Sequence, residues 1–306
     1  MIKSITVTNY LGDRLKLELA RPDRSGFIVR SITGLGPGKA NVTTSEVTTM
    51  DGGLFNSARL PVRNIVISLE FLWGSSIEDT RLKSYRYFPI KKQVTLLIET
   101  DNRIAEISGY VESNDPAIFS KNEGSDISII CPDPHFYSRG KNGIISVAFY
   151  GSDPSFEFPF SNESVTERLI KMSSINKNID GVIPYDGDVE NGITIRIHAT
   201  GEARNITISH RNMDSYGRIC IDTNKLESLT GSPIMEGDDI IITTVRGNKS
   251  VKLIRDGDTI NILNCLDKHT DWFQLVRGEN LFSYTAEDGL DNLNVIIEAQ
   301  VLYEGV

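Results

Sequence analysis

The fold class is indicated most clearly by residues 34–74, GLGPGKANVTTSEVTTMDGGLFNSARLPVRNIVISLEFLWG. This segment joins a glycine-rich loop to a run in which Ile65, Ile67 and Leu69 alternate with other residues. Alternation of this kind places every second side chain on one face, as a half-buried β-strand requires. The segment supplies no catalytic group. We therefore expect a β-structure that serves assembly more than chemistry.

The glycines of this loop invite comparison with nucleotide-binding loops. Closely spaced glycines such as Gly34, Gly36 and Gly38 let backbone N–H groups approach a phosphate. However, no Gly-Lys-Ser/Thr ending follows, the glycines lack the dinucleotide spacing, and threonine-rich residues stand where a helix should begin. The pattern instead predicts a loop in which glycine supplies a positive φ.

The length of 306 residues predicts two domains, each large enough to bury a core. Apolar residues make up 39% and charged residues 24%, which is an ordinary globular profile. Two prolines in Pro132-Asp133-Pro134 disfavour regular structure. We therefore predict domains over 1–134 and 135–306, with a linker at about 132–142.

Charge is divided unevenly along the chain. The net charge is −9, with 18 Lys and Arg against 16 Asp and Glu in residues 1–150, and 14 against 25 in residues 151–306. The second half is strongly acidic, and its self-repulsion would oppose phosphate contacts. We expect no specific nucleic-acid binding.

The cysteines and the N-terminus indicate the compartment. Three widely spaced cysteines do not predict a secreted disulfide framework. No secretory leader and no apolar run of about 18 residues are found. We expect folding in a cytoplasm and no membrane association.

The first half alternates in the manner of β-strands, with one exception. Ser75 and Glu78 match a capping box, and helical spacing continues until Pro89. We predict one helix here, with a basic cluster at Arg81, Lys83 and Arg86. This cluster is explained by a solvated helix face or by a partner contact.

The second half repeats short alternating runs with turn residues between them. Asp256-Gly257 is a strong hairpin signal. A further strand is expected at Phe156–Phe160 and a weak helix over 163–174. Many short strands with little helical periodicity predict an antiparallel β-sandwich. The fold class is therefore mainly β throughout.

No constellation for catalysis or metal binding emerges. The four histidines have no i+3 or i+4 pairing, and the acidic turns 186–190 and 256–258 lack the calcium-loop pattern. We expect no catalytic residue, no metal and no cofactor. Trp272 is a candidate for stacking on a sugar ring, although core packing explains it as well.

Several long phrases resemble one family. These are residues 34–74, RLKSYRYFPIKKQVTLLIETDNRIAEISGYVES, IICPDPHFYS, GVIPYDGDVENGITIRIHATG and the closing run to LYEGV. Together they resemble bacteriophage distal tail proteins along nearly the whole chain. The resemblance implies a ring-forming, sandwich-like N-terminal domain with one short helix. It also implies a C-terminal β-sandwich like a galectin or a carbohydrate-binding module.

The resemblance implies a structural virion protein at the tail tip, assembled in the bacterial host cytoplasm. Its partners would be five further copies in a six-subunit ring, the tail tube protein, a tail-associated hub or fibre protein and, in some members, receptor-binding proteins. In a head-to-tail ring, each copy offers two unlike surfaces. The candidate subunit-contact residues are Gly34, Gly36, Lys39, Asp51, Arg59, Arg63, Arg81 and Arg86.

Two other functions remain open from sequence. One is a glycan-binding adhesion module that acts through the C-terminal sandwich and Trp272. The other is a polysaccharide-degrading enzyme, which needs two carboxylates in one cleft. Nothing in the sequence selects such a pair.

Overall fold

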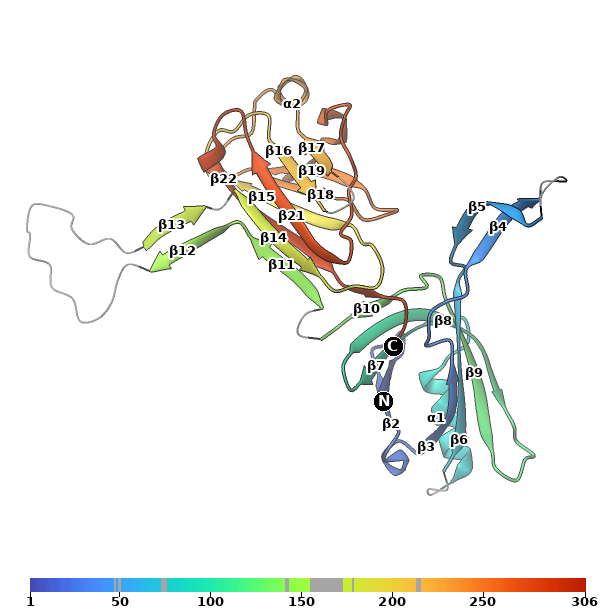
Figure 1. Ribbon diagram of the computed structural model, residues 1–306. Coiled ribbons are helices and arrows are strands. Elements are labelled where there is room, and N and C mark those ends of the chain that lie inside the picture. The colour runs from blue at the N-terminus through green and yellow to red at the C-terminus, as the bar shows by residue number, and fades with distance from the viewer. Residues whose placement is uncertain are drawn as a thin grey trace, which may run out of the picture. The chain divides into compact units, whose positions relative to one another are not determined.

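A computed structural model describes residues 1–46, 48, 51–72, 76–140, 143–154, 173–177, 179–212 and 216–306. The chain divides into two compact units. Unit 1 comprises Met1–Gly143 together with Leu302–Val306, and unit 2 comprises Ile144–Val301. Unit 1 is thus discontinuous in sequence, because the last five residues return to it. Figure 1 shows both units as mainly β-structure.

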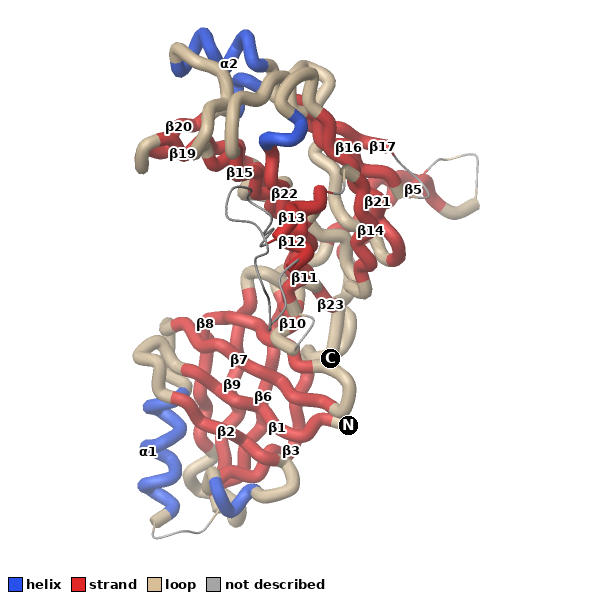
Figure 2. The backbone as a smooth tube through the Cα atoms, turned by 90° about the vertical axis from the view of Figure 1, so that its left-hand side faces the viewer, coloured by secondary structure: helices blue, strands red, loops and turns tan. Residues whose placement is uncertain are grey.

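Unit 1 contains eleven of the strands in the described residues and one α-helix. The strands are β1 (Ile2–Thr8), β2 (Arg14–Glu18), β3 (Phe27–Thr33), β4 (Asn41–Glu46), β5 (Gly53–Arg59), β6 (Arg63–Phe71), β7 (Gln93–Thr100), β8 (Ile104–Pro116), β9 (Gly124–Cys131), β10 (Phe136–Ser138) and β23 (Leu302–Tyr303). The helices are α1 (Ile77–Tyr87) and the short 3-10 turn η1 (Pro22–Arg24). Nine of these strands form one sheet, with a main path β2-β1-β7-β8-β9-β6-β3. In Figure 2 the strands of this sheet run side by side, with α1 next to them.

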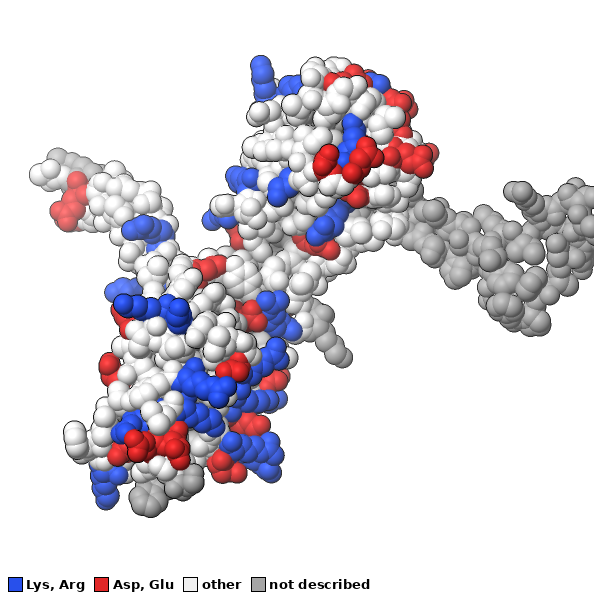
Figure 3. Space-filling view, turned by 180° about the vertical axis from the view of Figure 1, so that it is seen from behind, with Lys and Arg blue, Asp and Glu red and all other residues white. Residues whose placement is uncertain are grey.

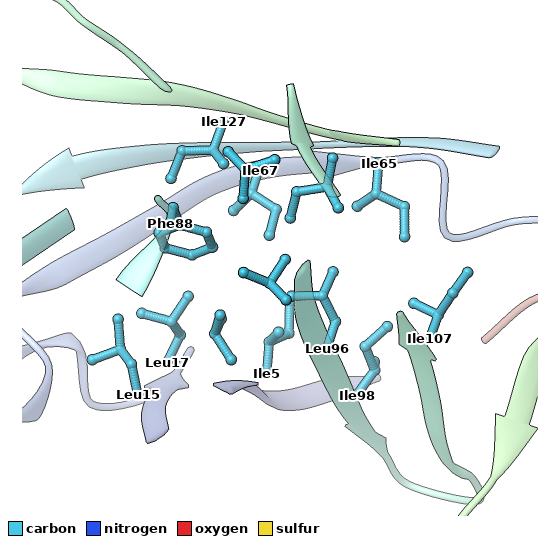
Figure 4. Close-up of a cluster of buried hydrophobic side chains, with 14 of the residues drawn as sticks. Ile5, Leu15, Leu17, Ile65, Ile67, Phe88, Leu96, Ile98, Ile107 and Ile127 are labelled. Carbon is cyan, nitrogen blue, oxygen red and sulfur yellow. The ribbon is translucent and has the colours of Figure 1, made fainter. Parts of the chain in front are cut away.

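The core of unit 1 lies between two halves of this one sheet. In Figure 4, Ile65 and Ile67 of β6 face Ile5, Leu17 and neighbouring side chains of β1 and β2. All four are at most 1% exposed. These residues are the apolar members of the alternating runs, so the predicted period of two is confirmed here.

Helix α1 confirms the predicted helix and shifts its cap by one residue. The Oγ atom of Ser76 accepts a hydrogen bond from the N–H of Asp79 at 3.4 Å. Ser75, the predicted cap, lies outside the described residues. The helix ends at Tyr87, two residues before Pro89, because proline cannot donate a further helical hydrogen bond.

Unit 2 is a sandwich of two antiparallel sheets, as the pattern predicts. The strands are β11 (Ile144–Ala148), β12 (Tyr150–Pro154), β13 (Ser173–Lys177), β14 (Asp180–Tyr185), β15 (Ile193–Ala199), β16 (Thr207–Arg211), β17 (Tyr216–Cys220), β18 (Asp239–Thr243), β19 (Ser250–Arg255), β20 (Asp258–Asn261), β21 (Gly278–Thr285) and β22 (Leu293–Gln300). One sheet has the order β11-β22-β15-β18-β19-β20 and the other β14-β21-β16-β17, while β12 and β13 pair separately. Phe149, next to the first sheet, meets Tyr284 of the second with ring centroids 6.0 Å apart.

Local signals explain the turns and the helices of unit 2. Asp256 and Gly257 have φ values of 53° and 88°, and Arg255 pairs with Asp258, so the predicted hairpin is confirmed. The helix α2 (Thr223–Thr230) was not predicted, although Asp222 caps its first turn and Gly231 ends it with a φ of 82°. Two short 3-10 turns, η2 (Leu263–Cys265) and η3 (Leu290–Asn292), complete the unit. The strand expected at Phe156–Phe160 lies outside the described residues, as do residues 163–172 of the helix expected over 163–174. The last two residues of that predicted helix, Ser173 and Ser174, belong to strand β13 instead.

Candidate subunit-contact surfaces

The glycine-rich loop leads into a two-stranded hairpin that stands apart from the sheet. We call residues 39–62 the arm; its strands β4 and β5 pair only with each other. Every residue of both strands is exposed. Figure 1 shows the two strands extending beyond the sheet of unit 1. A two-stranded hairpin alone is marginally stable in water, so the arm has the character of a segment that packs against another chain.

A bulge in the arm places Phe55 on the same face as Val42. Thr43 is paired with Ser57, but Thr44 is paired with Phe55, so that Asn56 is the extra residue. Directly paired residues lie on the same face of a hairpin. One face therefore carries Val42 with Ala58 and Thr44 with Phe55, whereas Thr43 with Ser57 and Ser45 with Leu54 lie on the other. Phe55 is 68% exposed, which is unusual for an aromatic side chain without a partner.

The base of the arm is fixed by a close approach of backbone to backbone. Gly34 has a φ of 84°, as predicted for this loop. A Cβ atom at Gly34 would collide with the carbonyl oxygen of Asn64 in β6. Position 34 therefore requires glycine for two separate reasons. The carbonyl of Gly36 accepts a hydrogen bond from Arg63.

Arg63 lies where the arm returns to the sheet, and only 6% of it is exposed. Its Nε donates to the carbonyl of Pro134 at 2.6 Å, and its Nη1 donates to the carbonyls of Gly34 and Gly36, both at 2.6 Å. Its Nη2 donates to the carbonyl of Glu304 at 2.7 Å. The guanidinium carbon also lies 4.7 Å from the ring centre of Phe136. Burial lowers the pKa of Arg63 from its ordinary value, although an arginine stays charged in proteins.

A second surface of unit 1 combines aromatic, aliphatic and basic side chains around helix α1. Its exposed apolar residues, which we call the helix patch, are Tyr10, Leu11, Leu82, Tyr85, Ile90 and Tyr110. Two contacts place Tyr10 in this region: Lys92 Nζ lies 5.3 Å from its ring centre, and its neighbour Asn9 donates to the carbonyl of Arg86 in α1 at 3.1 Å. Aromatic residues with adjacent cations are typical of protein interfaces.

The basic residues near the helix patch are held by acidic partners or carbonyls. Arg86 Nη2 lies 2.9 Å from Asp13 Oδ2, and the hydrogen bond raises the pKa of Arg86. Arg81 lies 3.6 Å from Glu78. Lys83 donates to the carbonyl of Ser25 at 2.8 Å. Figure 3 shows Lys and Arg side chains gathered over unit 1 on the face seen there.

The candidate contact residues thus separate into three groups. Lys39, Asp51 and Arg59 are exposed on the arm. Gly34, Gly36 and Arg63 form its base, where Arg63 is buried inside the protomer. Arg81 and Arg86 lie on α1. The sequence did not predict the apolar residues of either surface. The bulge cannot be recognised from residue alternation, and the helical spacing does not indicate that Leu82 and Tyr85 are exposed.

Trp272, the candidate for sugar stacking, already has a partner within the protein. Lys249 Nζ lies 5.4 Å from the centre of its ring, and the residue is half-buried. Its neighbour Phe273 is buried and stacks on His210 at 5.0 Å between ring centroids. A cation over the indole covers one of the two faces that a sugar could use. The role of Trp272 in sugar stacking stays a prediction.

The described residues contain no group of three or more His, Cys, Asp or Glu side chains that could hold a metal ion. Within the same part of the chain, no helix is long and apolar enough to span a membrane.

The fold matches that of a solved phage protein over almost its full length. The crystal structure of the Dit protein (gp 19.1) of phage SPP1, presented as a paradigm of the hub adsorption apparatus in phages infecting Gram-positive bacteria, aligns with a TM-score of 0.61. The alignment covers 97% of this chain and 98% of that one at 11% identity. The phage P2 baseplate in its activated conformation with calcium aligns over 98% of this chain and 99% of that chain, with 12% identity and a TM-score of 0.43.

No protein-family model and no curated protein matches the sequence. The identity to SPP1 Dit is too low to transfer residue roles, so the comparison establishes fold alone. At that level it confirms the resemblance found in the sequence. In both units, this chain has the fold of a phage distal tail protein.

Proposed function

We propose that this protein is a structural subunit of a ring at the distal end of a phage tail. The single observation that carries the proposal is the arm, whose two strands are fully exposed and whose bulge places Phe55 beside Val42, Thr44 and Ala58. Such a hairpin gains stability when another chain covers the face that carries Phe55 and Val42. The fold shared with SPP1 Dit, a hub protein, supports the same role.

Ring closure needs two unlike surfaces on each copy, and unit 1 offers two candidates. We propose that the arm of one copy contacts the next copy and that the helix patch forms part of the opposite contact. Heterologous contacts of this kind close into a ring when the rotation between copies is a simple fraction of a turn. Six copies are proposed, by resemblance to distal tail proteins.

The proposed partners are the tail tube protein on one side and a hub or fibre protein on the other, with receptor-binding proteins at the periphery. The role is structural and involves no catalysis. The site of action is the tail tip of the virion, and assembly takes place in the host cytoplasm. The alternative of a glycan-binding module is not favoured by Trp272, because Lys249 lies over its ring.

The test compares two aspartates placed on opposite faces of the arm. Phe55→Asp puts a charge on the face of Phe55 and Val42, and Thr43→Asp puts the same charge on the opposite face. Native mass spectrometry of the wild type is expected to give six times the 34.0 kDa of one chain. Phe55→Asp should leave protomers, whereas Thr43→Asp should keep the ring. Protomers for the wild type at high concentration, or rings for Phe55→Asp, would contradict the proposal.

A further inference from the structure

The last five residues of the chain are fitted to the base of the arm. Strand β23 pairs with β10, with Phe136 opposite Tyr303 and Tyr137 opposite Leu302. Beyond it, the N–H of Val306 donates to the carbonyl of Leu35 at 3.0 Å. Residues 302–306, which we call the strap, therefore contact both the strand that precedes unit 2 and the loop that precedes the arm.

The contact between the strap and the loop depends on a glycine. A Cβ atom at Gly305 would lie 3.0 Å from the carbonyl oxygen of Leu35 and 3.1 Å from the nitrogen of Pro37. Both distances are shorter than ordinary carbon contacts, and both neighbours are backbone atoms that cannot move aside. Gly305 thus allows two backbones to touch, and this fit ties the position of the strap to that of the loop.

Two arginines, Arg63 and Arg103, donate hydrogen bonds to backbone carbonyls of the strap. Arg103 donates through Nη1 to the carbonyl of Gly305 at 3.1 Å, and its guanidinium carbon lies 4.1 Å from the ring centre of Tyr303. Arg63 donates to Glu304 as well as to Gly34, Gly36 and Pro134. One buried side chain therefore joins the entry of the arm, its exit, the residues before β10 and the strap.

The sharing of Arg63 makes these segments dependent on one another. Its charge is offset by carbonyl oxygens, and a buried donor that loses its acceptor costs more than the bond itself contributed. When the strap leaves, Arg63 loses the Glu304 carbonyl and is opened to water. The remaining bonds to Gly34 and Gly36 then compete with solvent and weaken.

We propose that the strap is a positioning device that fixes the orientation of the arm. The chain enters unit 2 after β10 and leaves it before β23, and these two strands pair with each other. A force transmitted from unit 2 through either connection therefore acts on the strap. Through the strap it acts on the base of the arm. The arm is held in one orientation while the strap is docked. It becomes free to swing when the strap is released. The use of this device in assembly rests on the proposed ring function, but the coupling itself is a property of the protomer.

The experiment measures the orientation of the arm in the full chain. Spin labels are attached at Ser57→Cys on β5 and Arg14→Cys on β2, both exposed, in a Cys220→Ser background, because Cys131 and Cys265 are buried. Labelled and unlabelled chains both carry Phe55→Asp, so that no neighbouring copy holds the arm, and they are mixed so that pulsed dipolar spectroscopy records distances within one protomer. The strap is loosened by Tyr303→Ser and removed in a chain that ends at Val301.

The chain with an intact strap should give one narrow distance distribution, and both strap variants should give a broad one. Hydrogen exchange at residues 302–306 verifies that Tyr303→Ser has released the strap. The control is Arg139→Gln, which breaks an exposed ion pair with Glu106 near the strap and should leave the distribution narrow. A narrow distribution in a variant whose strap exchanges freely would overturn the proposal. Because the readout comes from the protomer, failure to form rings would count against the proposed function alone.

Discussion

Replacing Arg63 with alanine removes the side chain that joins four segments of unit 1. The side chain donates four hydrogen bonds to backbone carbonyls at 2.6–2.7 Å. A net contribution of about 1 kcal/mol for each bond gives a loss of about 4 kcal/mol. Small domains are stable by about 5–15 kcal/mol, so this loss is a large part of the stability of unit 1.

The loss should be measured for unit 1 separately, because a protein with two units does not unfold in one step. Hydrogen exchange followed by mass spectrometry reports the opening free energy of individual peptides, and those of β6 and β9 carry the answer for unit 1. Peptides of β15 and β22 in unit 2 should not change. The matched control is Arg59→Ala, which removes the same charge from an exposed position on the arm.

The predicted loss is refuted if Arg63→Ala lowers the opening free energy of unit 1 by less than about 1 kcal/mol, which is the net contribution of a single hydrogen bond. Such a result would mean that water satisfies the four carbonyls as well as the guanidinium does. Arg63→Lys separates charge from geometry, because an ammonium group keeps the charge but cannot reach four divergent acceptors. We expect lysine to recover less than half of the loss.

Three further predictions concern single positions. Gly34→Ala should destabilise unit 1 by about 2 kcal/mol or more, measured by the same exchange experiment, because the residue has a positive φ and its Cβ would collide with Asn64. Asp238→Ala should destabilise unit 2 by about 3 kcal/mol in calorimetry, because it removes the buried carboxylate that accepts hydrogen bonds from the partly buried Arg255; unchanged melting would refute this. Burial lowers the pKa of His210 from its ordinary value of 6.5, so below about pH 6.5 the unfolded chain binds a proton that the folded chain does not bind. The melting temperature of unit 2 should therefore fall as the pH drops below about 6.5. His210→Gln should make this dependence of the melting temperature on pH weaker.

The strands were predictable wherever one face is buried and the register is regular. Ile65 and Ile67 repeat every second residue, and the structure buries both. The same rule fails in the arm, because Asn56 adds a residue to β5 and moves Phe55 to the face of Val42. Both faces of the arm are exposed, so burial leaves no periodic signal there.

The placement of the candidate subunit contacts on the loop and the helix stays a prediction, whereas the surroundings of Arg63 could not be predicted. The glycine-rich loop was predicted from its closely spaced glycines, and the helix was predicted from its capping box and helical spacing. Arg63 was expected at a subunit contact as a charged residue, whereas the structure buries it among carbonyls. Its acceptor on Glu304 lies 241 positions away in the chain, and no local pattern reports a contact of that span.

The discontinuity of unit 1 has a consequence for biosynthesis. Residues 302–306 are synthesised after every strand of unit 2, because they follow Val301 in the chain. Until then, Arg63 and Leu35 lack the carbonyl of Glu304 and the N–H of Val306. A polypeptide that stops before residue 302 therefore lacks two of the contacts that complete the base of the arm.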